Sequence, residues 1–342
     1  MVFSMSFRDK IKGKVLDSSD MYNHYKNESE MLSGELAEEI KKLNKEVKSL
    51  KKKQKNTDKT LKSYNRLFNK LYLDYELTPK GALKYTQDLC LELIDFIEKV
   101  CKKHDITFWL DCGSALGAKR HGGYVPWDDD MDISMPRRDY MKFKNIIGDE
   151  IKNSNLEGIV GYPECRIFNN RVIGFVTVSV KFSRNIFAAV DIFPMDYISE
   201  VPEDIEEIYA HARNAFNDDI FAGGDKTESM KKVYKSLNLS LDEAEYMIIG
   251  VDTPKGKVNS PRITETEKVF PLIEMKFAER TYPCPNDLDH YLTQIYGEDY
   301  DKIPQRLNFH SRVDKLKKRE GFEEEFEKCL SLLKQANENF EK

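Results

Sequence analysis

The sequence lacks the cysteine pattern of a disulfide framework or of a zinc site. Its 342 residues include six cysteines, but these are scattered, with no C-x-x-C pair and no histidine at a metal-binding spacing from them. We therefore expect reduced and mostly buried thiols, which is typical of a cytosolic protein.

Long apolar runs and an excess of positive charge are also missing. No stretch approaches 18 consecutive apolar residues, and no apolar core follows Met1–Phe7, so we expect a cytoplasmic protein without signal peptide or membrane span. The formal net charge is −5, and the absence of a basic field disfavours general nucleic-acid binding. The length is sufficient for a substantial core in one large domain or two smaller ones.

The N-terminal part divides into two segments. Residues 1–30 are polar and irregular, and we expect a flexible segment there. In residues 31–76 apolar side chains recur at alternating spacings of four and three, which predicts a helical coiled-coil arm that joins two copies into a homodimer. The alternative is a long helix that folds back onto its own chain. The positions are Leu36, Ile40, Leu43, Val47, Leu50, Leu61, Tyr64, Phe68, Leu71 and Tyr75, with Gln54 and Thr57 between them.

The same helix is rich in lysine. The lysines are Lys41, Lys42, Lys45, Lys48, Lys51, Lys52, Lys53 and Lys55. A solvated helix face is the simpler interpretation. The alternative is peripheral contact with anionic lipid headgroups at the inner membrane face.

The stretch from Phe108 to Asp132 carries the clearest chemical signal in residues 77–342. An apolar run that ends at Gly113-Ser114 predicts a buried strand and then a tight turn. Backbone N–H groups in such a turn can approach a phosphate closely.

Two aspartates follow this turn in an alternating pattern. Asp130 and Asp132 alternate with Met131 and Ile133, so in a strand the two carboxylates share one face. Because neighbouring carboxylates repel each other, a divalent cation is the usual reason for keeping both ionised. The pattern therefore predicts a Mg²⁺ or Mn²⁺ site, although a surface-exposed acidic strand end is the simpler alternative.

At these residues the chain resembles a known family. The match consists of Gly113-Ser114-Ala115-Leu116-Gly117-Ala118, then Arg120-His121, Gly123 and Val125-Pro126-Trp127-Asp128-Asp129-Asp130-Met131-Asp132-Ile133. This long, ungapped run closely resembles the central signature of the LicD family, which includes the fukutin-type enzymes. The resemblance covers about Leu77 to Asp196 and resumes weakly near Phe270 to Tyr300. It leaves residues 201–265 as a variable insertion.

The resemblance implies both a fold and a reaction. LicD proteins are similar to DNA-polymerase-β-like nucleotidyltransferases, and they transfer phosphocholine or a polyol phosphate from a CDP-activated donor to a sugar hydroxyl. It also implies a third carboxylate on a neighbouring strand. Asp191, embedded among apolar residues that make an uncompensated charge costly, is the candidate for this ligand and for the proton acceptor.

Further residues are assigned from their position around this motif. We expect Asp128 to lie on the metal face and contact the ligands, and Asp129 to point away. Gly113 and Ser114 are expected to bind the donor phosphates. Arg120 and His121 either cap the C-terminal end of a short helix or also bind the donor phosphates. Arg306 and His310 are candidates by position alone.

The coarse pattern of the remaining chain predicts an α+β fold, with a mixed, mostly antiparallel sheet flanked by helices after the N-terminal arm. Helices are expected from Thr78 to Cys101, from Arg138 to Ile151, from Glu203 to Ala222, after Asp287 and from Glu320 to Phe340. Strands are expected at 165–168, 175–182 and 187–193, and a hairpin at 270–282.

Three functions fit these observations. The leading hypothesis is metal-dependent transfer of a phospho-substituent from a CDP-linked donor to a glycan or glycolipid of the cell surface, such as lipopolysaccharide or teichoic acid. The second is a nucleotidyltransferase that uses a nucleoside triphosphate, and the third is a non-catalytic coiled-coil scaffold. The identity of the transferred group depends on the shape of the pocket.

Overall fold

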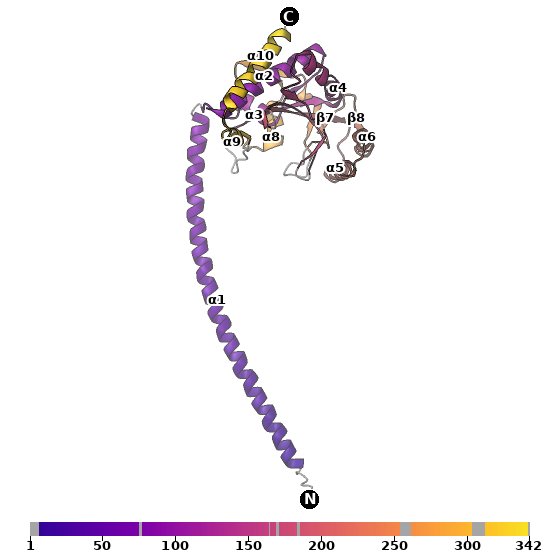
Figure 1. The fold of residues 1–342 in the computed structure, drawn as a ribbon. Coiled ribbons are helices and arrows are strands. Elements are labelled where there is room, and N and C mark those ends of the chain that lie inside the picture. Colours follow the sequence, from indigo (N-terminus) through magenta and orange to yellow (C-terminus); the bar gives the residue numbers. More distant parts are fainter. Residues whose placement is uncertain are drawn as a thin grey trace. The chain divides into compact units, whose positions relative to one another are not determined.

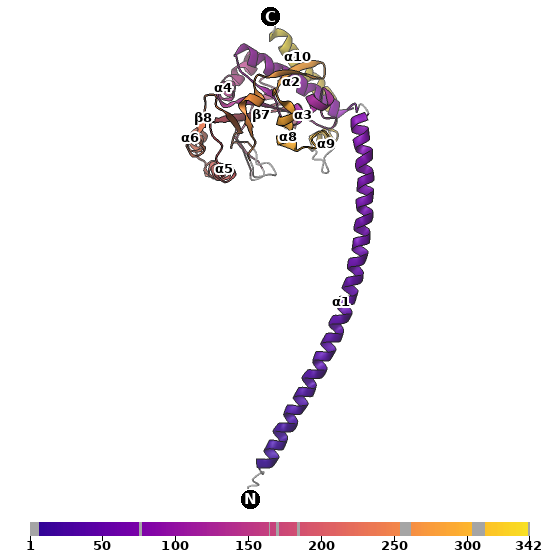
Figure 2. The ribbon, with the colours of Figure 1, turned by 180° about the vertical axis from the view of Figure 1, so that it is seen from behind.

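The computed structural model describes residues 7–74, 77–163, 165–168, 171–182, 185–253, 261–302 and 312–340. The chain divides into two compact units, which are an N-terminal unit (Met1–Asp74) and a C-terminal unit (Tyr75–Lys342). Figures 1 and 2 show the ribbon from opposite sides.

The described part of the N-terminal unit is a single helix, α1 (Phe7–Asp74), of 68 residues. It begins within residues 1–30, where we expected a flexible segment, rather than at residue 31. The segment contains no proline, and adding polar residues to an existing helix requires no new nucleation, so the helix extends through it. None of the helices in the described part of the chain combines the length and hydropathy that a membrane span requires.

The C-terminal unit contains the remaining helices and the described strands. The helices are α2 (Ala82–Lys103), α3 (Cys112–His121), α4 (Arg137–Asn153), α5 (Ile205–Phe221), α6 (Lys226–Leu237), α7 (Thr266–Val269), α8 (Leu288–Tyr296), α9 (Arg312–Leu316) and α10 (Phe322–Phe340). The strands are β1 (Trp109–Leu110), β2 (Met131–Pro136), β3 (Val160–Gly161), β4 (Arg166–Phe168), β5 (Arg171–Ile173), β6 (Val176–Phe182), β7 (Asn185–Ile198), β8 (Leu239–Ser240), β9 (Tyr246–Ile249), β10 (Ile263–Glu265), β11 (Ile273–Phe277) and β12 (Arg280–Cys284).

The main sheet is mixed and is built around the long strand β7. Its order is β1-β2-β7-β6-β3, with β8 and β9 paired to the second half of β7 and β10 paired to β9. Strands β2 and β7 run parallel, whereas the other pairings in this sheet are antiparallel. The predicted α+β fold with a mostly antiparallel sheet is confirmed, as is the separate hairpin β11–β12.

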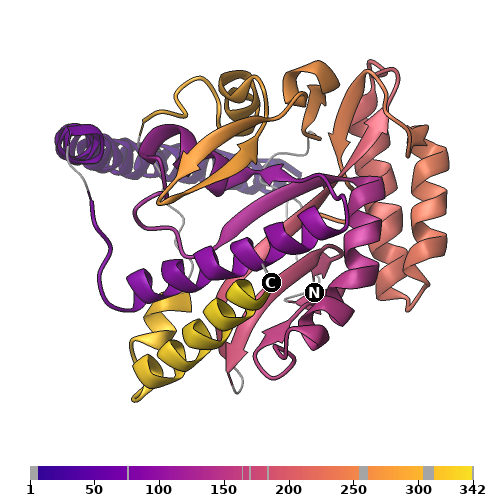
Figure 3. The same cartoon turned by 90° about the horizontal axis from the view of Figure 1, so that it is seen from above.

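One face of the sheet packs against helices. Met131 and Ile133 of β2 and Val190 and Ile192 of β7 belong to one buried apolar cluster with residues of α2, α4 and α10. Figure 3 shows α2 and α10 side by side over the sheet. Because successive strand residues point to opposite faces, the residues between these apolar positions face the other side of the sheet.

Residues 201–253 and 261–265, which belong to the expected variable insertion at 201–265, form part of this fold. Helices α5 and α6 pack with Ile198 of β7 and Ile248 of β9 in a second apolar cluster, and β8 and β9 extend the main sheet. Figures 1 and 2 show the α5–α6 pair at the side of the sheet away from α3 and α8.

A buried ion-pair network ties this region to the centre. Arg137, at the start of α4, donates two hydrogen bonds of 2.7 Å to Asp196 and two of 2.9 Å to Asp252. All three side chains are buried. Such paired, bidentate contacts are the arrangement that makes buried charges tolerable, and they lock α4, β7 and the segment after β9 together.

Candidate active site

The parallel pairing of β2 with β7 places two of the predicted ligands side by side. Asp132 is the register partner of Asp191, and Met131 and Ile133 are paired with Val190 and Ile192. Since the apolar partners enter the core beneath the helices, both carboxylates project from the opposite face of the sheet.

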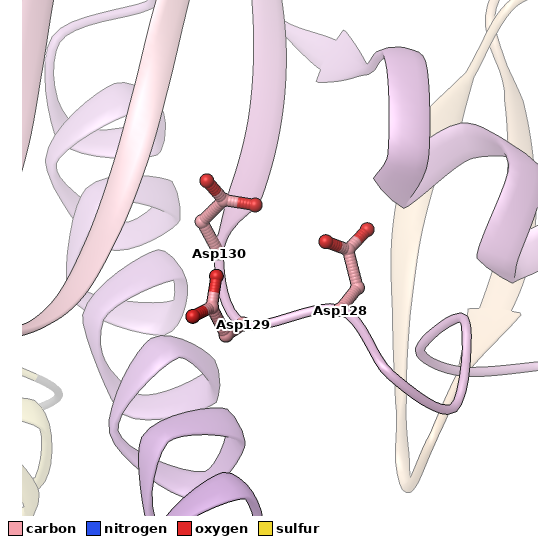
Figure 4. A group of neighbouring side chains, drawn as sticks. All are labelled: Asp128, Asp129 and Asp130. Atoms are coloured by element: carbon pink, nitrogen blue, oxygen red, sulfur yellow. The ribbon is translucent and has the colours of Figure 1, made fainter. Parts of the chain in front are cut away.

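Asp128, Asp129 and Asp130 lie in the loop that leads into β2. One carboxylate oxygen from each of them lies within 4.8 Å of the others, a separation that a single metal ion can bridge. Figure 4 shows the three side chains on this loop. We expected Asp129 to point away by strand alternation. That expectation was wrong because β2 begins only at Met131, so the alternation does not apply to the loop.

The N-terminus of α3 approaches these carboxylates through a glycine. Gly113 donates its backbone N–H to Oδ2 of Asp132 at 3.3 Å. A Cβ atom on Gly113 would lie 2.5 Å from Oδ2 of Asp128, so a larger residue here would require the Asp128 carboxylate to move. Gly113 and Ser114, which we expected in a tight turn after the strand, lie in the first turn of α3. Their role in binding donor phosphates stays a prediction.

Ser114 makes a structural contact in the described part of the chain, and its expected role in binding donor phosphates stays a prediction. Its hydroxyl oxygen accepts a hydrogen bond of 2.9 Å from the backbone N–H of Asp132. The side chain is buried. Ser114 therefore fixes the start of β2 against the first turn of α3, and with it the position of Asp132.

Asp111 stabilises the first turn of α3. It caps α3 by accepting a 2.6 Å hydrogen bond from the N–H of Cys112. Arg262 donates to its two carboxylate oxygens at 2.7 and 2.6 Å, and Ser134 and Tyr291 also donate to it. Burial raises the pKa of Asp111, but the charge and hydrogen bonds of Arg262 outweigh this effect and leave the pKa below its ordinary value.

The electrostatic state of Asp132 reflects the crowding of carboxylates. Burial raises its pKa well above the ordinary value, and the charges of Asp130, Asp191, Asp128 and Asp111 raise it further, in that order of importance. A bound divalent cation would relieve this repulsion. The donors are carboxylate oxygens, which Mg²⁺ and Mn²⁺ prefer, so the residues present fit such an ion.

A neighbouring strand supports Asp191. Thr177 of β6 is the register partner of Asp191 and donates its hydroxyl to Oδ1 of Asp191 at 2.6 Å. Arg166 of β4 in turn donates to the hydroxyl oxygen of Thr177 at 2.9 Å. These two hydrogen bonds fix the orientation of Asp191. They also link the guanidinium group of Arg166 to Asp191 through the hydroxyl of Thr177.

Comparison with known proteins agrees with this geometry. Residues 105–235 match the family described as LicD/FKTN/FKRP, nucleotidyltransferase domain. The chain carries a LicD-family domain. The matched region contains β1, α3, β2 and β7, and it continues through α5 and most of α6. The resemblance therefore extends into residues 201–235, which we had placed outside it, and this agrees with the packing of α5 and α6 on β7 and β9.

Individual relatives match over short segments. Lipopolysaccharide cholinephosphotransferase LicD of Haemophilus influenzae is 37% identical over 67 residues, which are 20% of this chain and 25% of the relative. Ribitol 5-phosphate transferase FKRP of Homo sapiens is 32% identical over 71 residues, 20% of this chain and 14% of the relative. An uncharacterized protein of Rickettsia typhi is 28% identical over 130 residues, which are 35% of this chain and 40% of the relative.

Two residues of the LicD-like signature lie at the far end of α3. Arg120 donates to the carbonyl oxygen of Tyr300 at 2.6 Å and to Nε2 of His121 at 3.2 Å. Burial lowers the pKa of Arg120 to about 10, and burial followed by the charge of Arg120 lowers that of His121 to about 4. About two helical turns separate them from Gly113 and Ser114. Their role in donor binding stays a prediction.

The structure adds residues to the site that sequence reasoning missed. Thr177, Arg166 and Arg262 reach it only through strand register or through contacts between distant segments, for which the sequence holds no local signal. Arg306 and His310 lie outside the described residues.

Proposed function

We propose that this protein transfers a phospho-substituent from a CDP-linked donor to a hydroxyl group of a glycan, with Mg²⁺ or Mn²⁺ as cofactor. The observation that carries the proposal is the parallel register of β2 and β7. It sets Asp132 beside Asp191, next to the loop carboxylates and the N–H of Gly113. Phosphoryl-transfer sites of this type act mainly by positioning and by electrostatic stabilisation.

Each side chain has a role in this scheme. Asp130, Asp132 and Asp191 would hold the ion. Asp128, whose carboxylate lies beside Gly113, would contact these ligands. When bound, the ion would neutralise charge on the diphosphate and on the departing CMP. The N–H of Gly113 and the guanidinium of Arg166 would bind phosphate oxygens, which are the anionic partners that such groups prefer.

The chemical step requires one proton acceptor. The acceptor hydroxyl oxygen forms a bond to the phosphorus that carries the substituent, and the bond from that phosphorus to CMP breaks, with CMP keeping the electron pair. Asp191 would take the proton of the hydroxyl. The hydrogen bond from Thr177 to Oδ1 of Asp191 would fix the orientation of this carboxylate relative to the acceptor hydroxyl.

The relatives support this class of reaction. Their names describe one cholinephosphotransferase and one ribitol 5-phosphate transferase, both of which move a substituted phosphate. The aligned segments cover 25% and 14% of those relatives, so the donor and acceptor of this chain are part of the proposal. The matched family is also described as a nucleotidyltransferase domain, which makes transfer of a nucleotide from a triphosphate the second candidate.

Ligand-dependent thermal stabilisation followed by product analysis tests the proposal. The full chain is incubated with Mg²⁺ or Mn²⁺ and separately with CDP-choline, CDP-glycerol, CDP-ribitol, CTP and UTP. We expect a metal-dependent rise in melting temperature with one CDP-alcohol, and release of CMP once an acceptor glycan is added. Release of pyrophosphate from a triphosphate would establish the second candidate. The absence of any metal-dependent shift would refute both and favour a scaffold.

A further inference from the structure

The apolar stripe along α1 is exposed in the single chain. Leu36, Ile40 and Leu43 are 60%, 50% and 53% exposed, and Val47 and Leu50 are 44% and 61% exposed. The stripe continues with Leu61, Tyr64 and Phe68, which are also more than half exposed. A single helix has no means of burying such a seam, so these side chains require a partner surface.

The residue types at the seam select the kind of partner. In the heptad abcdefg, Ile40 and Val47 occupy position a, and Leu36, Leu43 and Leu50 occupy position d. β-Branched residues at a combined with leucine at d favour a parallel, two-stranded coiled coil. This distribution therefore points to one other helix of the same kind that runs in the same direction.

The residues that flank the seam complement a second copy of α1. In a parallel pair, position g of one helix lies beside position e of the following heptad on the other helix. Glu46 at g would then meet Lys51 at e, and Lys53 at g would meet Asp58 at e. Both contacts join opposite charges, and each occurs twice because the two helices are identical. Charge complementarity thus favours a second copy of this chain in an aligned register.

The polar positions are consistent with the same arrangement. Gln54 at position a and Thr57 at position d interrupt the apolar seam near its middle, and they would face their own copies only in the aligned register. A polar residue at a single a position is a known means of fixing register and oligomer state. The lysines at positions b, c and f, among them Lys41, Lys45 and Lys48, remain on the outer surface.

We propose that α1 forms a parallel, in-register, two-stranded coiled coil with a second copy of this chain. Both C-terminal units then follow from the same end of the coiled coil, because α1 ends at Asp74 and the C-terminal unit begins at the next residue. This inference does not depend on the proposed reaction.

Disulfide cross-linking of full-chain variants that carry one added cysteine in α1 tests the orientation. Leu36→Cys places a thiol at a d position near the end of the seam, and α1 contains no native cysteine. In the parallel pair the two thiols meet and form a covalent dimer under mild oxidation. In an antiparallel pair with the seams fully overlapped, Leu36 of one chain lies opposite Phe68 of the other. The two copies of residue 36 are then roughly 48 Å apart along the axis, and no cross-link forms.

The matched control is Glu38→Cys, an f position on the outer side of the same helical turn. We expect a covalent dimer from Leu36→Cys only. The unmodified chain shows the background cross-linking by its native cysteines, and we expect it to sediment as a dimer. A monomeric mass, or equal cross-linking of the two variants, would overturn the proposal.

Charge exchange tests the partner pairing independently. Glu46→Lys makes positions 46 and 51 both basic, and Lys51→Glu in another chain makes both acidic. Each variant alone repels its own copy, whereas a mixed pair restores both attractions. We expect differently tagged variants to form mainly mixed dimers when combined. A random distribution of mixed and unmixed dimers would contradict the parallel g-to-e contacts.

Discussion

At the scale of single residues, Asp132 is the side chain at which the stability of the fold and the proposed metal binding conflict. Its pKa is raised by burial and by four neighbouring carboxylates. The folded state therefore binds a proton at Asp132 more readily than the unfolded chain does. In the absence of metal, Asp132 lowers the stability of the fold increasingly as the pH rises above the ordinary aspartate pKa of about 3.9.

Replacing Asp132 by asparagine is expected to separate the two effects. Asp132→Asn keeps an oxygen for the N–H of Gly113 but removes the negative charge, so transferase activity should fall by orders of magnitude. In the presence of a metal chelator, the melting temperature of the variant should be higher than that of the unmodified chain. This difference should grow from pH 5 to pH 8. Calorimetry at several pH values measures this.

Mn²⁺ provides the control for Asp132→Asn. The ion should stabilise the unmodified chain strongly and the variant weakly, which reverses their order of stability. A variant that is less stable than the unmodified chain in chelator at pH 8 would show that repulsion among the carboxylates does not govern the stability of the site.

Thr177 offers a second prediction at this scale, because its hydroxyl holds Asp191 at 2.6 Å and receives a hydrogen bond from Arg166. Thr177→Val keeps the shape of the side chain but removes both contacts. We expect a loss of about 10- to 100-fold in metal affinity or turnover, the usual effect of removing a group that orients a ligand. Manganese titration and initial rates measure the two quantities.

Thr264→Val is the matched control. Oγ1 of Thr264 is buried without a hydrogen-bond partner in the described part of the chain, and Thr264 lies on β10, whereas Thr177 and Asp191 lie on β6 and β7. Activity should be unchanged in this variant. Equal losses in the two variants would assign the effect of Thr177→Val to general packing.

At the scale of secondary-structure elements, Asp111 connects four segments. It caps α3, and it accepts hydrogen bonds from Ser134 of β2, from Tyr291 of α8 and from Arg262, which precedes β10. Because α3 carries Gly113 and β2 carries Asp132, this buried contact sets the geometry of the candidate site. It contributes no group to the reaction itself.

Arg262→Leu is expected to lower the free energy of unfolding at pH 7 by about 3 kcal/mol. This is the lower end of the range for breaking a buried ion pair, since Ser134 and Tyr291 still donate to Asp111. Lys268→Ala, which breaks an exposed pair with Asp287, should lower the free energy of unfolding much less. Urea unfolding measures both.

The pH dependence of Arg262→Leu has a definite sign. In the unmodified chain the pKa of Asp111 is lowered, so the stabilisation by this pair is present above the ordinary aspartate pKa and is lost as the pH falls below it. The difference in stability between the unmodified chain and the variant should therefore narrow as the pH falls below about 4. A constant difference would mean that the cost is one of packing.

At the scale of the whole molecule, the two units are expected to unfold separately. Their contacts form distinct clusters that divide between Asp74 and Tyr75. If α1 pairs with a second copy, its melting is bimolecular and shifts to higher temperature as the protein concentration rises, whereas that of the C-terminal unit does not. Far-UV circular dichroism at several concentrations should show both transitions.

The double variant Leu43→Asp with Leu50→Asp serves as the control for this experiment. It places charges in the seam and should abolish the concentration-dependent transition, while the second transition stays in place. A single transition independent of concentration in the unmodified chain would contradict separate unfolding.

The sequence by itself determined the class of the fold and the main elements of the site. Apolar periodicity located the seam of α1, the helix α4 and the first part of β7, which continues to Ile198 beyond the expected end at Phe193. The ungapped match around Gly113 and Asp132 indicated the LicD family. These features are local, because a helix stripe, a strand alternation and a short motif are each set by residues close together in the chain.

Only the tertiary structure decided which distant residues meet. The register of β7 against β2 and β6 sets Asp191 beside Asp132 and Thr177, and a shift of one residue would have turned each carboxylate into the apolar core. The start of β2 at Met131 brought Asp129 toward its neighbours, and packing against β7 and β9 made residues 201–249 part of the fold. Register and packing depend on the summed burial of many side chains, which no single segment contains.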